Sequence, residues 1–143
     1  MLASQKEHLF EYEYDFSVDG GAVSSIALRP LPSNAKLAEG DVVVGFYAKV
    51  ETAFTSGGSA TVTLGNTADT DGYSVDFFSA ASANAILTPG VLDGALIWDS
   101  TADALKGYYV TSASNTQNLL ITVGTAALTA GKLRVYLRVV RFK

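Results

Sequence analysis

The chain has 143 residues, enough for one domain with a substantial hydrophobic core and no disulfides. It has no cysteine and one histidine, which excludes a disulfide framework, thiolate zinc sites, a cysteine nucleophile and metal sites built from several histidines. The formal net charge of −4 and the sequence pI of about 4.8 argue against a nucleic-acid-binding protein, which normally presents a basic surface.

The composition favours a folded protein made of strands. Apolar residues make up 48% of the chain and charged residues only 17%, the reverse of a disordered chain. Alanine, glycine, serine and threonine are abundant, as expected for short strands joined by tight turns. No window approaches 18 uninterrupted apolar residues, so we expect no membrane-spanning helix.

The first predicted element is a strand over residues 9–18, where apolar and polar residues alternate. Its apolar face carries Phe10, Tyr12, Tyr14, Phe16 and Val18. The following Asp-Gly-Gly predicts a turn, because glycine adopts positive φ without a steric clash. We expect residues 1–143 to form a single β-sandwich domain, with residues 1–9 as an N-terminal arm.

The next predicted strands cover residues 23–29, 42–54 and 59–64. Pro30 and Pro32 end the first of them, since proline cannot donate in a central ladder. The second places one set of apolar residues on one side: Val42, Val44, Phe46, Ala48 and Val50. Gly45 in this strand indicates a bulge or a close backbone approach. The turn at Gly57 and Gly58 then predicts a hairpin with the third strand.

The second half of the chain is less regular. Strands are predicted over residues 73–78, 96–98, 108–111, 119–123 and 132–142. Residues 79–87 are the one predicted helix, of one or two turns, ended by Pro89 and Gly90. About eight strands with at most one short helix predict an all-β fold. We expect a single antiparallel β-sandwich, with the jelly roll as the favoured arrangement.

Charged residues gather in the two terminal strands. The basic ones are Lys132, Arg134, Arg138, Arg141 and Lys143, and the acidic ones are Glu7, Glu11, Glu13, Asp15 and Asp19. Opposite charges on neighbouring strands favour pairing, so we predict that these strands lie side by side with complementary outer faces. The alternative is a basic stripe that docks onto an acidic partner, and the two are compatible if the stripe is partly exposed.

Residues 69–72, with the sequence Asp-Thr-Asp-Gly, resemble the opening of a calcium loop, which uses alternate oxygen ligands and a glycine bend. A loop of the EF-hand type also needs a bidentate glutamate further on, and no glutamate follows Glu51. Aspartate and glycine are also ordinary turn formers. We therefore favour a polar loop and assign no metal site.

No catalytic set stands out in the sequence. A Ser-His-Asp arrangement would have to use His8, close to the chain terminus. A pair of catalytic carboxylates must face each other across a cleft, and the spacing of Asp76, Asp93, Asp99 and Asp103 singles out no pair. Glycine-rich phosphate loops are missing as well. We predict that the protein is not an enzyme and uses no cofactor.

Three aromatic residues offer a platform for a sugar ring: Trp98, Tyr108 and Tyr109. Because Trp98 directly follows Leu96 and Ile97, we favour a place for it in the core. A carbohydrate-binding module stays an alternative, with these three residues as its site.

Several segments are similar to those of one protein family. They are the turn at residues 38–41 (AEGD), the strand end at 50–55 (VETAFT), and the segments 60–65 (ATVTLG), 69–73 (DTDGY) and 128–137 (LTAGKLRVYL). Together with the alternating first strand, they resemble the small β-sandwich virion proteins of tailed bacteriophages. The resemblance covers most of the chain.

The resemblance implies a structural role in a virion. We expect a capsid decoration or cement protein on the outer surface of the capsid, which binds and stabilises the head shell. Its partners would be the major capsid protein and its own copies in a homotrimer, with no nucleic acid or membrane. The arm of residues 1–9 or the basic C-terminal strand would contact the shell or a neighbouring subunit. The alternatives are a head-fibre, spike or tail component and a small subunit that forms the shell itself.

Overall fold

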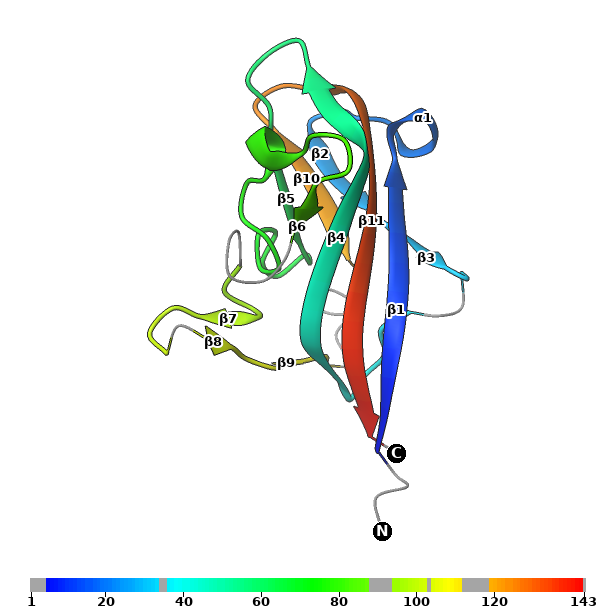
Figure 1. Cartoon of the computed structure of the whole chain (residues 1–143), viewed down its shortest axis with the longest axis vertical. Coiled ribbons are helices and arrows are strands. Elements are labelled where there is room, and N and C mark those ends of the chain that lie inside the picture. The colour runs from blue at the N-terminus through cyan, green and yellow to red at the C-terminus, as the bar shows by residue number, and fades with distance from the viewer. Residues whose placement is uncertain (1–4, 34–35, 88–93, 103, 112–118, 143) are drawn as a thin grey trace.

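The computed structural model describes residues 5–33, 36–87, 94–102, 104–111 and 119–142 (Figure 1). The first sheet has the order β3-β1-β11-β4-β6, with β9 also paired to β4. Its strands are β1 (Gln5–Asp15), β3 (Arg29–Leu31), β4 (Asp41–Ser56), β6 (Ile86–Leu87), β9 (Tyr108–Tyr109) and β11 (Leu128–Phe142). The three long strands β1, β11 and β4 lie side by side in Figure 1.

The second sheet has the order β2-β10-β5. Its strands are β2 (Ser24–Ala27), β5 (Thr61–Gly65) and β10 (Leu120–Gly124). A separate hairpin pairs β7 (Trp98–Asp99) with β8 (Ala104–Leu105). The only helical pieces among the described residues are α1 (Phe16–Asp19) and the 3₁₀ turn η1 (Phe78–Ala80), and neither is long and apolar enough to cross a membrane. The predicted all-β antiparallel sandwich is confirmed.

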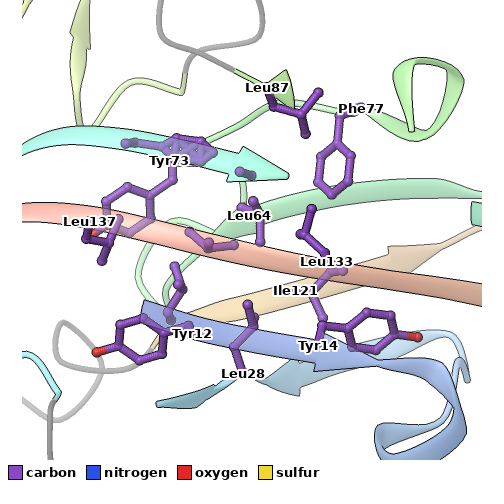
Figure 2. Close-up of a cluster of buried hydrophobic side chains, with 14 of the residues drawn as sticks. Tyr12, Tyr14, Leu28, Leu64, Tyr73, Phe77, Leu87, Ile121, Leu133 and Leu137 are labelled. Carbon is purple, nitrogen blue, oxygen red and sulfur yellow. The ribbon is translucent and has the colours of Figure 1, made fainter. Parts of the chain in front are cut away.

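The core fills the space between the two sheets. The alternation of β11 turns one face inward, and the side chains on that face are fully buried: Leu133, Val135, Leu137 and Val139. Tyr12 and Tyr14 of β1 pack in the same cluster as Leu64 and Ile121 of the second sheet (Figure 2). Full burial of one such side chain contributes about 1.5–3 kcal/mol. The period-2 pattern therefore fixes which face of each long strand points inward.

A bulge in β4 changes which valines face the core. The register between β11 and β4 shifts where Arg138 lies opposite Gly45 and the next residue lies opposite Val43. As a result Val43 is fully buried, while Val42 and Val44 are only half-buried. The bulge at Gly45 was predicted, but the assignment of Val42 and Val44 to the inner face is wrong, because the extra residue reverses the alternation before the bulge.

The predicted hairpin between residues 42–54 and 59–64 is wrong. β4 pairs with β11 and β6 in the first sheet, whereas β5 pairs with β10 in the second. The turn at Gly57 and Gly58 carries the chain across the sandwich from one sheet to the other. Two inward-facing apolar runs joined by glycines are compatible with a hairpin or with a crossing, so the local pattern cannot separate them.

The first strand is shorter at its C-terminal end than predicted. Asp15 caps α1 because its side chain accepts a hydrogen bond from the Ser17 backbone N–H. The helical turn that follows takes Phe16 to a half-buried position and leaves Val18 exposed. The cap therefore overrides the alternation that would have continued the strand.

The predicted helix over residues 79–87 is also wrong. Its first residues belong to the single turn η1, and its last two form β6. Between them Asn84 has a positive φ of 67°, which ends any helix. The Asn84 N–H donates to the Val50 carbonyl, and the Val50 N–H donates to the Ala85 carbonyl. Pairing with β4 thus wins over the helix propensity of the alanines in this segment.

Other predicted strands are present in shortened or divided form. Residues 73–78 do not form a regular ladder with β5. They pair with it at one isolated bridge, between Ser74 and Leu64. The run 23–29 divides at Leu28, so that β2 lies in the second sheet and β3 at the edge of the first. Pro30 lies inside β3, where an edge strand tolerates it. The other short runs correspond to β7, β9 and β10.

The predicted N-terminal arm is largely part of the sheet. Gln5 to Leu9 pair with Phe142 to Arg138 of β11, so residues 5–9 belong to β1. An arm is thereby limited to residues 1–4, which lie outside the described residues. The alternation of apolar and polar residues is weaker before Phe10, and for this reason it did not signal the start of the strand.

Candidate functional site

The outer face of the first sheet carries a ladder of ion pairs, which we call the charged face. Its members are Glu7, Glu11, Glu13 and Asp15 of β1 and Lys132, Arg134 and Arg138 of β11. The guanidinium of Arg134 lies 2.8 Å from the Glu11 carboxylate and 2.8 Å from that of Glu13. Arg138 lies 3.0 Å from Glu7. The prediction that the first and last strands lie side by side with complementary charges is confirmed.

The electrostatics of the charged face are shared within the chain. The hydrogen bond from Arg134 holds the pKa of the Glu13 carboxyl below its usual value, with further attraction from Lys132 and Arg29. The same bond raises the pKa of the Arg134 guanidinium. Since these cations already hold carboxylates, they do not form the free basic stripe that the alternative required.

Apart from the charged face, an ion pair between Arg141 and Asp41 fixes the end of β11 to the start of β4. Arg141 donates from Nε and Nη2 to the two Asp41 carboxylate oxygens, both at 2.7 Å. Asp41 is fully buried and also accepts from the Ala38 backbone N–H at 2.9 Å. The Arg141 guanidinium lies 5.2 Å from the ring centroid of Phe10. Sequence reasoning missed this pair, because the partners are 100 residues apart and Asp41 reads as a turn residue.

One edge of β1 is open, and we call the side of residues 5–10 away from β11 the open edge. The Asp15 N–H points to that side, where it donates to Asp19 Oδ2 at 2.8 Å. Strand alternation directs the backbone groups of Glu7 and Leu9 to the same side. β3 pairs only with residues 11–13, and no described strand pairs with the rest of this edge. Leu9 is 64% exposed. Such an edge accepts an added strand.

The outer face of the second sheet is different in chemistry, and we call it the hydroxyl face. Across it lie Ser25, Thr122 and Thr63 in register. The Ser25 and Thr122 hydroxyls are 2.8 Å apart, and the Thr63 hydroxyl donates to the Thr70 carbonyl at 2.8 Å. The three strands of this sheet contain no charged residue. The strands of this face therefore carry hydroxyl groups and no charge.

The loop at residues 69–72 is organised by its own hydrogen bonds. The Asn66 side chain accepts from the Asp69 N–H at 2.9 Å, and the Gly72 N–H donates to the Asp69 carbonyl at 3.1 Å. A hydrogen bond with the Asp71 carboxyl raises the pKa of Asp69. The described residues bring together no group of three or more acidic, histidine or cysteine side chains that could hold a metal. This geometry is that of a polar turn.

Trp98 lies beside a pocket of about 250 Å³, which we call the Trp98 pocket. It is lined by Asp71, Val75, Gly94, Ala95, Trp98 and Ser100. The core position predicted for Trp98 is wrong: its neighbour Ile97 fills the core, whereas Trp98 is half-buried and outside the core cluster.

The two tyrosines do not join Trp98 in one platform. Tyr108 packs against the core and accepts a hydrogen bond from the Asn66 side chain at 3.1 Å. Tyr109 is 57% exposed on β9, at the edge of β4, and is not part of the pocket lining. The signal that could have separated Trp98 from Ile97 is the alternation within a short strand, which sends adjacent side chains to opposite faces.

The acidic residues considered for catalysis serve local turns. Asp76 Oδ1 accepts from the backbone N–H groups of Val62 and Phe78, and Asp99 Oδ1 accepts from those of Thr101 and Ala102. These two backbone bonds lower the pKa of Asp99. The other two acids, at positions 93 and 103, lie outside the described residues.

His8 is likewise accounted for by packing. Its ring is stacked on Phe10, with 5.9 Å between the ring centroids. The described residues thus contain no histidine in contact with a serine and an aspartate.

No protein-family model matches the chain, and no curated protein matches it either. Among solved structures, a chain of the cyanophage Pam1 capsid asymmetric unit aligns with a TM-score of 0.62 and 13% identity, over 96% of this chain and 86% of that one. The protein has the fold of a chain found in a phage capsid. The resemblance to small β-sandwich virion proteins is therefore confirmed for the fold.

A second solved structure is more distant. A chain of the acidic stable capsid of Helicobacter pylori bacteriophage KHP30 covers 97% of this chain and is covered over 93% of its own length, with 16% identity and a TM-score of 0.44. Because the Pam1 capsid chain superimposes better, it defines the shared fold.

Proposed function

We propose that this protein is a structural protein of a phage virion, and that within the virion it decorates and cements the outer surface of the head shell. The observation that carries this proposal is the fold shared, over 96% of the chain, with a chain of the Pam1 capsid asymmetric unit. Asp76 and Asp99 serve local turns and His8 packs on Phe10, which supports a role without catalysis.

The strand order supports the finer proposal that the sandwich is a jelly roll. Strands β1 and β4 lie in one sheet, and β2 and β5 lie in the other. The last strand, β11, inserts between β1 and β4, while the strand before it, β10, inserts between β2 and β5. This interleaving is what results when a long antiparallel pair is rolled into two facing sheets.

The open edge of β1 is the contact we propose for the shell. Its occupant would be an extended segment of the major capsid protein, added as a further strand beside Glu7 and Leu9. Unpaired N–H and C=O groups supply the hydrogen bonds. The predicted homotrimer and an arm of residues 1–4 remain part of the same proposal.

The proposed contact can be tested by adding the purified protein back to head shells that lack it. The shells are prepared from the phage that encodes the protein. Because the Leu9 N–H points away from β11, Leu9→Pro removes one outward donor without breaking a ladder bond of the native sheet. We expect Leu9→Pro to weaken shell binding at least about tenfold, and Leu9→Ala, which keeps the N–H, to bind nearly as the parent does. Equal binding by the two variants would contradict the proposed contact.

Two further measurements separate the finer alternatives. Sedimentation equilibrium over a range of concentrations distinguishes a stable trimer from a monomer, which would need the shell in order to assemble. Antibody labelling of intact virions distinguishes the head surface from a head fibre, spike or tail.

A carbohydrate-binding role is favoured by one specific observation, the Trp98 pocket.

A further inference from the structure

The Trp98 pocket lies away from the surfaces that the proposed shell contact uses. It is formed by the irregular segment after β5 and by the base of the β7–β8 hairpin, which lies beside the two sheets in Figure 1. None of its lining residues belongs to β1 or β11. A ligand at this pocket and a shell segment at the open edge would not compete.

The backbone of Trp98 is held in place beside the pocket. The Trp98 backbone N–H donates to the Gly94 carbonyl at 3.1 Å, and Trp98 lies opposite Leu105 in the hairpin. The preceding residue, Ile97, is fully buried in the core and anchors the hairpin at its base. A half-buried tryptophan on an anchored strand presents a rigid aromatic surface at little entropic cost.

Another part of the pocket lining, at Gly94, is fixed by close backbone packing. A Cβ at Gly94 would collide with the Asp71 carbonyl oxygen and the Gly72 backbone, so only glycine fits there. This contact holds the backbone of residues 71 and 72 against Gly94, and Asp71 lines the pocket together with Trp98. The hydroxyl of Ser100 completes the polar part of the lining.

The combination of groups selects one class of ligand. A pyranose ring has an apolar face of C–H groups that packs on an indole, and edge hydroxyls that donate to a carboxylate such as Asp71 or exchange hydrogen bonds with Ser100. None of the described lining residues is cationic, so an acidic sugar would find a carboxylate and no counter-charge from them. A quaternary ammonium group is bound by several aromatic rings, and Trp98 is the one aromatic residue among the described lining residues.

We propose that the Trp98 pocket binds a neutral pyranose unit of a glycan, with Trp98 as the stacking platform and Asp71 and Ser100 as partners of the sugar hydroxyls. The site belongs to the single chain, so it can be tested on the isolated protein whatever its place in a virion. A single shallow pocket gives weak binding, which many copies on one particle would multiply.

The chain has one tryptophan, which makes its fluorescence a direct probe of this pocket. We would titrate the protein with hexasaccharides of glucose, mannose and galactose, with polygalacturonate, and with choline. We expect a saturable shift of the emission with at least one neutral hexasaccharide, and at least about tenfold weaker effects of polygalacturonate and choline. Absence of any shift with the neutral sugars overturns the proposal, and so does stronger binding of the acidic polymer or of choline.

Variants then locate the site, with binding measured by affinity electrophoresis in a gel that contains the active sugar. We expect Trp98→Ala to lose retardation, and Asp71→Asn to weaken it about tenfold while keeping the shape of the pocket. Tyr109→Ala removes an exposed aromatic residue outside the pocket and is expected to change nothing. Thermal unfolding of each variant checks the fold.

Two outcomes would overturn the assignment. Sugar binding that survives Trp98→Ala in a folded variant would place the ligand elsewhere. Loss of shell binding by Trp98→Ala in a protein that binds none of the neutral sugars would identify the pocket as a protein contact. The second outcome contradicts this site without contradicting the virion role.

Discussion

The three long strands and the segment between β5 and β10 are built in different ways. β1, β4 and β11 are held by long ladders, by buried inward side chains, and by the charged face. The described residues of 66–111 form strands of only two residues, joined by turns that aspartate and asparagine side chains organise. The long strands form a rigid support, and the irregular segment uses the support to hold a pocket.

Stability and binding are assigned to different parts of this fold. Regular strands satisfy their backbone groups in the ladder, so their side chains are free to form the core and the ion pairs. Irregular backbone needs local acceptors instead, and it leaves half-buried side chains such as Trp98 available to a ligand. Substitutions in the long strands should therefore lower the free energy of unfolding most. Substitutions at the pocket should change it least and should affect ligand binding instead.

The largest effect is expected in the core of the long strands. Leu137→Ala removes a fully buried side chain and should lower the free energy of unfolding by about 2–5 kcal/mol, through lost burial and the cavity left behind. Val75→Ala, in the irregular segment, should change it by less than about 0.5 kcal/mol, because Val75 is partly exposed. Urea unfolding measures both, and equal losses would remove the distinction between the two regions.

The next effect concerns the buried end of the ion pair between β4 and β11. Asp41→Asn should cost about 2 kcal/mol, less than the 3–5 kcal/mol of a fully buried pair, since Arg141 keeps contact with water. Glu39→Gln removes a nearby exposed acid with no ion pair among the described residues, and it should cost almost nothing. If both substitutions leave the urea midpoint unchanged, the pair does not stabilise the sheet.

The charged face should give a smaller, pH-dependent contribution. The pKa of Glu13 is lowered in the folded chain, so its stabilisation is fully present above the unfolded pKa, about 4.3, and is lost as the pH falls through the folded pKa. Glu13→Gln should cost about 0.5–1 kcal/mol at pH 7 and flatten the fall in stability between pH 5 and about pH 3. An equally steep fall in this variant would assign the acid sensitivity to other carboxyls.

The smallest effect on stability is expected at the pocket. Trp98→Ala should lower the free energy of unfolding by less than about 1 kcal/mol, compared with 3–5 kcal/mol for a tryptophan in a core. The reason is that Ile97, and not Trp98, fills the core at the base of the hairpin. A loss of several kcal/mol in urea unfolding would show that Trp98 is a core residue after all.

The same two regions divide what the sequence could predict. Strict alternation over β11 predicted its buried face correctly, and the opposite charges of Glu13 and Arg134 predicted the neighbouring strands. In both cases a property repeated every second residue carries the information. A single irregularity escapes such a pattern: the bulge beside Gly45 moved Val43 into the core, and the cap at Asp15 ended β1 early.

Contacts between distant parts of the chain could not be predicted for a different reason. Asp41 and Arg141 are each ordinary in their local sequence, and only the β4–β11 register brings them together. The Trp98 pocket likewise depends on Gly94 packing against the backbone of Asp71. Its residue types could be recognised in the sequence, but their assembly into one site follows from the tertiary fold.

The protein composition of purified virions tests whether this protein is a structural component of the phage head. Quantitative mass spectrometry of particles from the phage that encodes the chain would measure its copy number relative to the major capsid protein. We expect a fixed ratio that stays with the heads after the tails are removed. Absence of the chain from intact, infectious particles would contradict a virion role, and recovery only with the tails would contradict the shell-binding role.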